Sequence, residues 1–132
     1  TVSQRSATIQ IGHSHSVEFL KFTPNGKTLI SACNSKIKFW DVESKSLIRT
    51  IEGRFPWLFG IALTPDGKTL ISASETLDFW DIKTGKLIAT IKENFSHVQD
   101  VVVSQNGQLF GIATHEEIKS SDEKMNFIQK VE

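Results

Sequence analysis

A segment of eleven residues recurs almost unchanged in this chain, and this repeat constrains the fold more than any other feature. Residues 22–32 read FTPNGKTLISA, and residues 63–73 read LTPDGKTLISA. The stretch that follows recurs as well, as FWDVESKSLIRTI at 39–51 and FWDIKTGKLIATI at 79–91. A period of about 40 residues predicts stacked copies of one structural unit, because each copy buries its apolar surface only against its neighbours.

A third copy of the unit is weaker. Residues 103–114, VSQNGQLFGIAT, keep the turn glycine, whereas 118–131 keep only the general shape of the repeat's end. Ser121 occupies the position at which we expect a third tryptophan. The turn glycines of the three copies are 41 and 40 residues apart: Gly26, Gly67 and Gly107. The chain is predicted to be one domain with a short leading strand and three repeat units: 7–11, 12–52, 53–92 and 93–132.

Each unit reads as four short strands. In the first unit Pro24-Asn25-Gly26 predicts a turn, since proline presets φ and glycine supplies the positive φ that follows. Lys36–Trp40 alternates polar and apolar residues, which is typical of a half-buried strand. No segment has a helical period, so we predict an all-β chain. The expected strands of the three units are 17–22, 27–33, 36–40 and 47–51; 58–63, 68–74, 76–80 and 87–91; and 98–103, 108–114, 116–120 and 126–131.

The composition argues against several classes of partner. Among 132 residues, 15 lysines and arginines balance 15 aspartates and glutamates. A net charge of zero gives no electrostatic reason to expect nucleic acid or an anionic membrane. No stretch approaches the roughly 18 apolar residues of a membrane helix, and no signal peptide is visible. The one cysteine, Cys33, cannot form an internal disulfide, which is compatible with the cytoplasm, where we expect the protein.

The period, the four strands and the closing Trp-Asp pair resemble the WD-repeat family. Gly12-His13, the Pro-Asn-Gly turn, Ser31 and Trp40-Asp41 resemble one full repeat, residues 54–81 resemble a second, and the third is degenerate. The resemblance covers about residues 7 to 132. It implies that each unit is a four-stranded antiparallel blade of a β-propeller, so the chain forms three blades of a partial propeller or of an oligomeric ring.

The resemblance also implies structural roles for particular residues. In this family a His, a Ser or Thr, an Asp and the Trp of a repeat form a hydrogen-bond network, and the Asp after the Trp forms a turn. The residues that match are His13, Ser31, Trp40, Asp41, Ser72, Trp80 and Asp81. Asn34 falls near the expected Asp of the first repeat; in the second, Arg54 replaces the His and Glu75 is the nearest acid. We therefore expect the blades to rely more on apolar packing than on this network.

Binding candidates come from the loops that share one rim in WD propellers. Arg54-Phe55-Pro56-Trp57 is the foremost of these, because large aromatic residues beside an arginine dominate interface energies. The alternative for Trp57 is that it begins a strand and packs between blades. The predicted protein-binding residues are His15, Arg54, Phe55, Trp57, Asn94, Phe95 and His97.

Catalytic and metal-binding patterns are missing from the sequence. It has no GxSxG, no phosphate-cradling glycine loop and no CxxC. His13-Ser14-His15 has the spacing of a metal pair on a strand, but no further ligands accompany it, so we predict neither a metal nor a cofactor. We expect a non-catalytic scaffold for other proteins. The alternatives are a sensor portion of a larger multidomain propeller protein and an enzyme that uses the central channel.

Three blades do not close a ring. Closed propellers have about 4 to 8 blades, and an isolated arc exposes the outer faces of its end blades. Residues 7–11 resemble the end of a fourth strand, like residues 49–54. Two explanations stay open: the sequence is a portion of a larger propeller, or the chain assembles with another chain. We favour self-assembly, as a homodimer that completes a propeller, and expect that the bare monomer does not persist.

Overall fold

The structure, a computed structural model, describes residues 17–33, 36–52, 58–92, 98–114 and 125–130. In these segments all regular secondary structure is β-strand, and none of them forms a helix that could cross a membrane. The strands are β1 (Phe19–Phe22), β2 (Thr28–Ala32), β3 (Lys36–Asp41), β4 (Ser46–Glu52), β5 (Gly60–Leu63), β6 (Thr69–Ala73), β7 (Leu77–Asp81), β8 (Leu87–Ile91), β9 (Val98–Val103), β10 (Leu109–Thr114) and β11 (Met125–Lys130).

The first two repeats form two antiparallel sheets with the same design. The strand order is β1-β2-β3-β4 in one sheet and β5-β6-β7-β8 in the other, so each strand pairs with the next along the chain. The register is equivalent as well, because Trp40 pairs with Leu29 and Trp80 pairs with Leu70. All eight strands predicted for these repeats are present, and the all-β fold class is confirmed.

The third sheet differs from the sequence prediction. Its described strands run in the order β11-β10-β9, and β11 pairs directly with β10. The prediction placed a third strand at 116–120 and a fourth at 126–131, but residues 125–130 occupy the third position of this sheet. The assignment of 126–131 to a fourth strand was therefore wrong.

The same pairing corrects the position of the missing tryptophan. Gln129 pairs with Phe110 as Trp80 pairs with Leu70, so Gln129 and not Ser121 stands where a tryptophan would be. Three residues separate β6 from β7, whereas residues 115–124 separate β10 from β11. Counting at a fixed offset assumes loops of constant length, but the position of a strand in a sheet is decided by its pairing and not by its sequence number.

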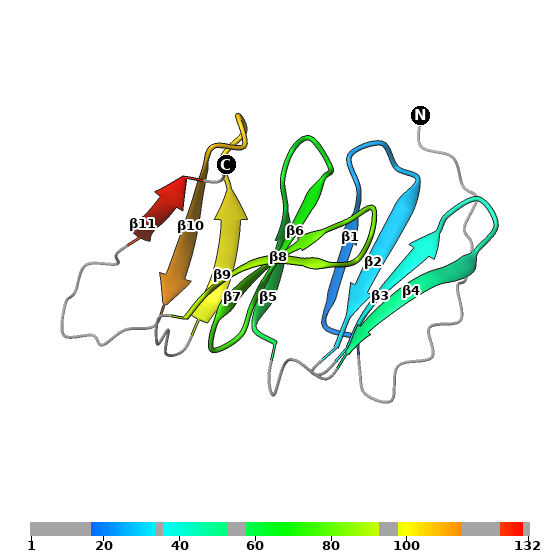
Figure 1. Cartoon of the computed structure of the whole chain (residues 1–132), viewed down its shortest axis with the longest axis horizontal. Coiled ribbons are helices and arrows are strands. Elements are labelled where there is room, and N and C mark those ends of the chain that lie inside the picture. Colours follow the sequence, from blue (N-terminus) through cyan, green and yellow to red (C-terminus); the bar gives the residue numbers. More distant parts are fainter. Residues whose placement is uncertain (1–16, 34–35, 53–57, 93–97, 115–124, 131–132) are drawn as a thin grey trace.

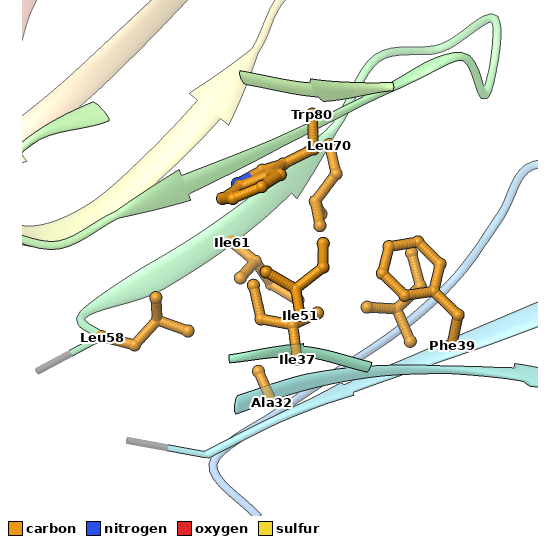
Figure 2. Close-up of a cluster of buried hydrophobic side chains, with 9 residues drawn as sticks. Ala32, Ile37, Phe39, Ile51, Leu58, Ile61, Leu70 and Trp80 are labelled. Carbon is orange, nitrogen blue, oxygen red and sulfur yellow. The ribbon is translucent and has the colours of Figure 1, made fainter. Parts of the chain in front are cut away.

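Buried apolar side chains join the first sheet to the second (Figure 2). Strands β2 to β4 supply one side of this core, and β5 to β7 with the preceding Leu58 supply the other. Each buried Leu, Ile or Phe side chain stabilises the fold by about 1.5–3 kcal/mol relative to an exposed one. The buried members are Ile30, Ala32, Ile37, Phe39, Ile51, Leu58, Ile61, Leu70 and Trp80.

A second core joins the middle sheet to the third. Phe79 and Phe110 meet edge to face, with ring centroids 5.4 Å apart and an interplanar angle of 67°. Strand β5 contacts both β1 and β9, so the first strands of the three units lie side by side while the sheets fan outward (Figure 1). The middle sheet therefore buries both of its faces. The buried members of this core are Ala62, Ile71, Ala73, Leu77, Phe79, Val101, Phe110 and Ile112.

The turn between the first two strands of each unit is the same in all three copies. Its glycine has a φ of 72° to 74°, a conformation that side chains disfavour. The Thr64 hydroxyl donates to Asp66 at 2.7 Å, and Thr23 and Ser104 make the equivalent bonds to Asn25 and Asn106. The donating Thr64 hydroxyl and the Lys68 backbone amide lower the pKa of the Asp66 carboxyl from its usual value. These bonds explain why an aspartate or an asparagine follows Pro24 and Pro65.

Replacing Trp80 with alanine is expected to lower the free energy of unfolding by about 3–5 kcal/mol, the usual cost of truncating a core aromatic residue. Trp80 is 5% exposed and lies between two sheets, so its loss affects both. Urea unfolding followed by circular dichroism measures the change. As a control, Ile88→Ala on an exposed position should stay within about 0.5 kcal/mol of the wild type. Coincident curves for Trp80→Ala and the wild type would contradict the core position of Trp80.

Candidate functional site

Each of the first two blades contains a buried serine–tryptophan pair. Trp40 Nε1 donates to Ser31 Oγ at 3.0 Å, and Trp80 Nε1 donates to Ser72 Oγ at 2.9 Å. A buried indole N–H needs an acceptor, so each bond fixes the orientation of a large ring between strands. The structure thus places these four residues, which the resemblance assigned to a structural network, in two direct contacts.

The third blade lacks this polar pair. Val101 pairs with Ile112 as Ile61 pairs with Ser72, so an isoleucine takes the place of the serine. Ile112 is fully buried in the second core. The third blade therefore lacks both the tryptophan and the serine that would accept its hydrogen bond. A serine alone would leave a buried hydroxyl without its partner, which is unfavourable.

Asp41 and Asp81 are the last residues of β3 and β7, where the turns to the fourth strands begin. Asp41 Oδ2 accepts bonds from the Ser44 amide at 2.9 Å and from the Ser44 hydroxyl at 2.8 Å. These two donors, the backbone amide first, lower the pKa of the Asp41 carboxyl from its usual value. Asp81 Oδ2 accepts a bond from the Thr84 hydroxyl at 2.7 Å. Both carboxylates are occupied in holding turns, which is a structural use of the Trp-Asp pair.

Asp78 is a buried acid that the sequence analysis missed. It lies on β7 two residues before Trp80, and its Oδ1 accepts bonds from the hydroxyls of Thr90 at 3.0 Å and Thr76 at 3.2 Å. Glu75, which we expected near the acid position of this repeat, is exposed. The sequence did contain one indication of this role: an aspartate within an otherwise apolar strand is unusual, because strands are depleted in Asp.

Arg49 ties the outer strand of the first blade to the second blade. Its Nη1 and Nη2 atoms donate to the carbonyl oxygens of Thr84 and Lys83, each at 2.8 Å. Gly85, in the same turn, has a φ of 77°, and a Cβ atom there would lie 2.6 Å from Arg49 Cδ. The turn itself accepts another residue, since Lys45 has a φ of 60° at the equivalent position of the first blade, but the approach of Arg49 leaves no room for a Cβ atom at Gly85. The sequence predicted the turn, but it did not predict the contact with Arg49, which is more than 30 residues away in the chain.

The strand ends that lead to the predicted binding loops lie at one edge of the blades. Phe19 pairs with Ala32, which pairs with Ile37, which pairs with Ile51. The second blade repeats this arrangement, so β4 ends and β5 begins at the same edge of the two blades. The predicted residues themselves lie outside the described part of the chain: His13, His15, Arg54, Phe55, Trp57, Asn94, Phe95 and His97.

Charged side chains near the first strands are few in the part of the chain that the structure describes. Glu18, Lys21 and Asp100 are exposed there. Asp100 Oδ1 accepts a bond from the Val101 amide at 2.9 Å. Within the same described segments, no three His, Cys, Asp or Glu residues cluster in a way that could hold a metal ion.

Known proteins share the repeat over part of this chain. The family model "WD domain, G-beta repeat" matches residues 4–41. Nuclear distribution protein PAC1 of Arthroderma otae is 35% identical over 74 residues, which is 49% of this chain and 16% of that protein. Apoptotic protease-activating factor 1 of Homo sapiens is 24% identical over 68 residues, which is 51% of this chain and 5% of that protein. The chain thus spans only a small part of these relatives.

Solved WD40 structures share the fold. The WD40 repeats of RRP9 match with a TM-score of 0.73 and 22% identity, over 80% of this chain and 34% of that one. The structure of U3-55K matches with a TM-score of 0.72 and 22% identity, over 80% of this chain and 35% of that one. With the repeats, the sheets and the serine–tryptophan pairs, these matches show a WD repeat at residues 4–41 and the fold of WD40 β-propellers in the described part of the chain. Proteins of this class generally bind other proteins.

Replacing Asp78 with alanine is expected to lower the free energy of unfolding by about 1–3 kcal/mol, because two hydroxyl donors lose a buried acceptor. Lys38 provides a matched control, since it pairs with Ser31 as Asp78 pairs with Ser72. Lys38→Ala, at a half-exposed position, should cost about 0.5 kcal/mol or less. Equal unfolding midpoints for the two variants would show that Asp78 does not stabilise the fold more than Lys38 does.

Proposed function

We propose that this chain is a non-catalytic scaffold that binds another protein through loops at one rim of its blades. The observation that carries the proposal is the pair of buried cores between neighbouring blades. These cores hold adjacent sheets in a fixed relation, and the strands that precede residues 53–57 and 93–97, β4 and β8, end at the same edge of their sheets. A rigid support with loops at one edge is well suited to binding, because little entropy is lost when the partner docks.

The proposed anchor is Arg54-Phe55-Pro56-Trp57. Arginine and large aromatic residues are the types that contribute most to protein interfaces. His15, Asn94, Phe95 and His97 complete the proposed rim surface. The balanced charge of the chain supports a protein partner over nucleic acid or an anionic membrane. We propose the cytoplasm as its location, consistent with a single cysteine, Cys33, that is buried and free.

Replacing Phe55 and Trp57 together with alanine is expected to weaken binding of the cellular partner at least tenfold, which corresponds to the loss of about 1.4 kcal/mol or more. Partners that co-purify with the wild type are identified by mass spectrometry, and their affinities for purified wild type and variant are then measured by calorimetry. Unchanged circular dichroism would show that the fold is intact.

Lys68→Ala serves as the control for this experiment. Lys68 is exposed at the opposite edge of the second blade, beside the Asp66-Gly67 turn. Its loss should leave the affinity unchanged. If the double variant unfolds, then Phe55 and Trp57 belong to the core. If the folded double variant binds like the wild type, the rim proposal is wrong.

A second proposal concerns assembly, and it rests on the outer face of the first blade. Leu20 and Phe22 are 54% and 60% exposed. Ile61 occupies the place of Leu20 in the second blade and is only 3% exposed, because the first blade covers it. An apolar face of this kind is normally covered in a soluble protein. We propose that a blade from a second copy of the chain covers it in a homodimer.

Light scattering after size exclusion is expected to give about twice the chain mass of 14.8 kDa. Phe22→Asp should shift the protein to the mass of one chain, because a charge would be buried in the contact. Lys27→Asp, a charge change on the neighbouring exposed turn, should leave the dimer intact. A wild type with the mass of one chain would contradict self-assembly and favour the alternative, in which further repeats of a longer propeller protein cover this face.

A further inference from the structure

Contacts between neighbouring blades join two unlike faces. The face that meets the preceding blade, here called the leading face, contains Ile61 and Leu70 in the second blade. The opposite face, which meets the following blade and is called the trailing face, contains Ala62 and Ile71 in the second blade. In both described blade contacts a trailing face therefore packs against a leading face.

The three blades form an arc that ends in one face of each kind (Figure 1). One end is the leading face of the first blade, where Leu20 and Phe22 are exposed. The other end is the trailing face of the third blade. The two buried cores of the described segments lie between the blades, so no described blade covers either end face.

The trailing face of the third blade exposes apolar side chains of its own. Val102 lies on this face, because it pairs with Gly111 as Ala62 pairs with Ile71. Val102 is 48% exposed, whereas Ala62, which the third blade covers, is only 6% exposed. Leu109 lies on the same face, because the next residue of β10 is buried in the second core on the opposite face, and it is 39% exposed.

The third strand of this blade also keeps an apolar residue at a position that a following blade covers. Phe127 on β11 pairs with Gly111 as Phe79 on β7 pairs with Ile71. Phe79 belongs to the core between the second and third blades. The third blade thus retains an aromatic residue at this register position although it lacks the serine–tryptophan pair. This retention indicates that its trailing face is covered by a further blade.

We propose that the leading face of the first blade packs against the trailing face of the third blade of a second copy, and that this contact forms twice in the dimer. Each chain supplies one face of each kind, so two chains related by a twofold axis form two identical contacts and leave no end face uncovered. Two chains of three blades make six, within the range of about 4 to 8 for closed propellers. The net charge of zero causes no long-range repulsion between the copies. The inference rests on the proposed homodimer and adds which blades meet in it.

A dimer through two copies of the leading face is the main alternative. It would pack Leu20 and Phe22 against their own copies and would leave Val102 and Leu109 exposed at both ends. Neither of the described blade contacts joins two leading faces. The unlike pairing repeats a packing that the chain already makes twice, and it covers all four residues.

The test uses the full chain with one charge on each end face, as Phe22→Asp on the leading face and Val102→Lys on the trailing face. Each variant alone is expected to have a dissociation constant raised at least tenfold, because every contact in its dimer would bury an unpaired charge. Light scattering over a series of protein concentrations measures this change. An equimolar mixture of the two variants should regain about twice the chain mass of 14.8 kDa. In the mixed dimer one contact is native, and the other pairs the new aspartate with the new lysine.

Ile88→Lys is the matched control for Val102→Lys. It places the same charge on an exposed aliphatic residue of the middle blade, which contributes to neither end face. Its dissociation constant should stay within about twofold of the wild-type value. Leu109→Lys provides a second variant of the trailing face if circular dichroism shows that Val102→Lys does not fold.

Three results would contradict the inference, and they separate it from the homodimer proposal. A wild type with the mass of one chain would exclude the homodimer and this pairing with it. A dimer that Phe22→Asp dissociates but that Val102→Lys and Leu109→Lys leave intact would keep the homodimer and exclude the pairing of unlike faces. A mixture of Phe22→Asp and Val102→Lys that keeps the mass of one chain would also exclude this pairing.

Discussion

Apolar contact between the faces of neighbouring sheets is the interaction on which the rest of this structure depends. A four-stranded sheet with an apolar face on each side is unstable alone, because exposing either face to water is unfavourable. The middle blade buries both of its faces: Trp80 and Leu70 pack against the first blade, and Ile71 and Phe79 pack against the third. The polar contacts are arranged around this packing. Ser72 satisfies the indole of Trp80, and Arg49 bonds across the outer part of the same boundary.

The same architecture separates two kinds of exposed apolar surface. Leu20 and Phe22 lie on a sheet face, where a blade normally packs, so their exposure concerns assembly of the ring. Leu87 and Ile88 lie on β8, which among the described strands contacts only β7, so packing between the described blades does not cover them. The proposed rim site uses a third region, the loops at one end of the sheets.

Much of the fold could be predicted because each repeat carries its own local signals. The Pro-Asn-Gly and Pro-Asp-Gly turns and the alternating strands identified the eight strands of the first two blades. The third blade was only partly predicted, since its β10–β11 connection is longer than the repeat suggests and pairing moved Gln129 into the tryptophan position. For the candidate site, the roles of Trp40, Trp80, Asp41 and Asp81 followed from the resemblance, whereas the burial of Asp78 did not. The proposed rim residues lie outside the described segments and stay predictions.

The sequence by itself determined the repeat period, the turn chemistry and the two-faced apolar strands, because these depend on residues close together in the chain. Only the tertiary structure decided which contacts form between blades. Arg49 reaches a turn more than 30 residues away, and Gly85 must lack a side chain to admit it. The buried carboxylate of Asp78 accepts hydrogen bonds from Thr90 on the neighbouring strand and from Thr76. Such contacts depend on how sheets and strands meet in space, and neither spacing nor composition records that geometry.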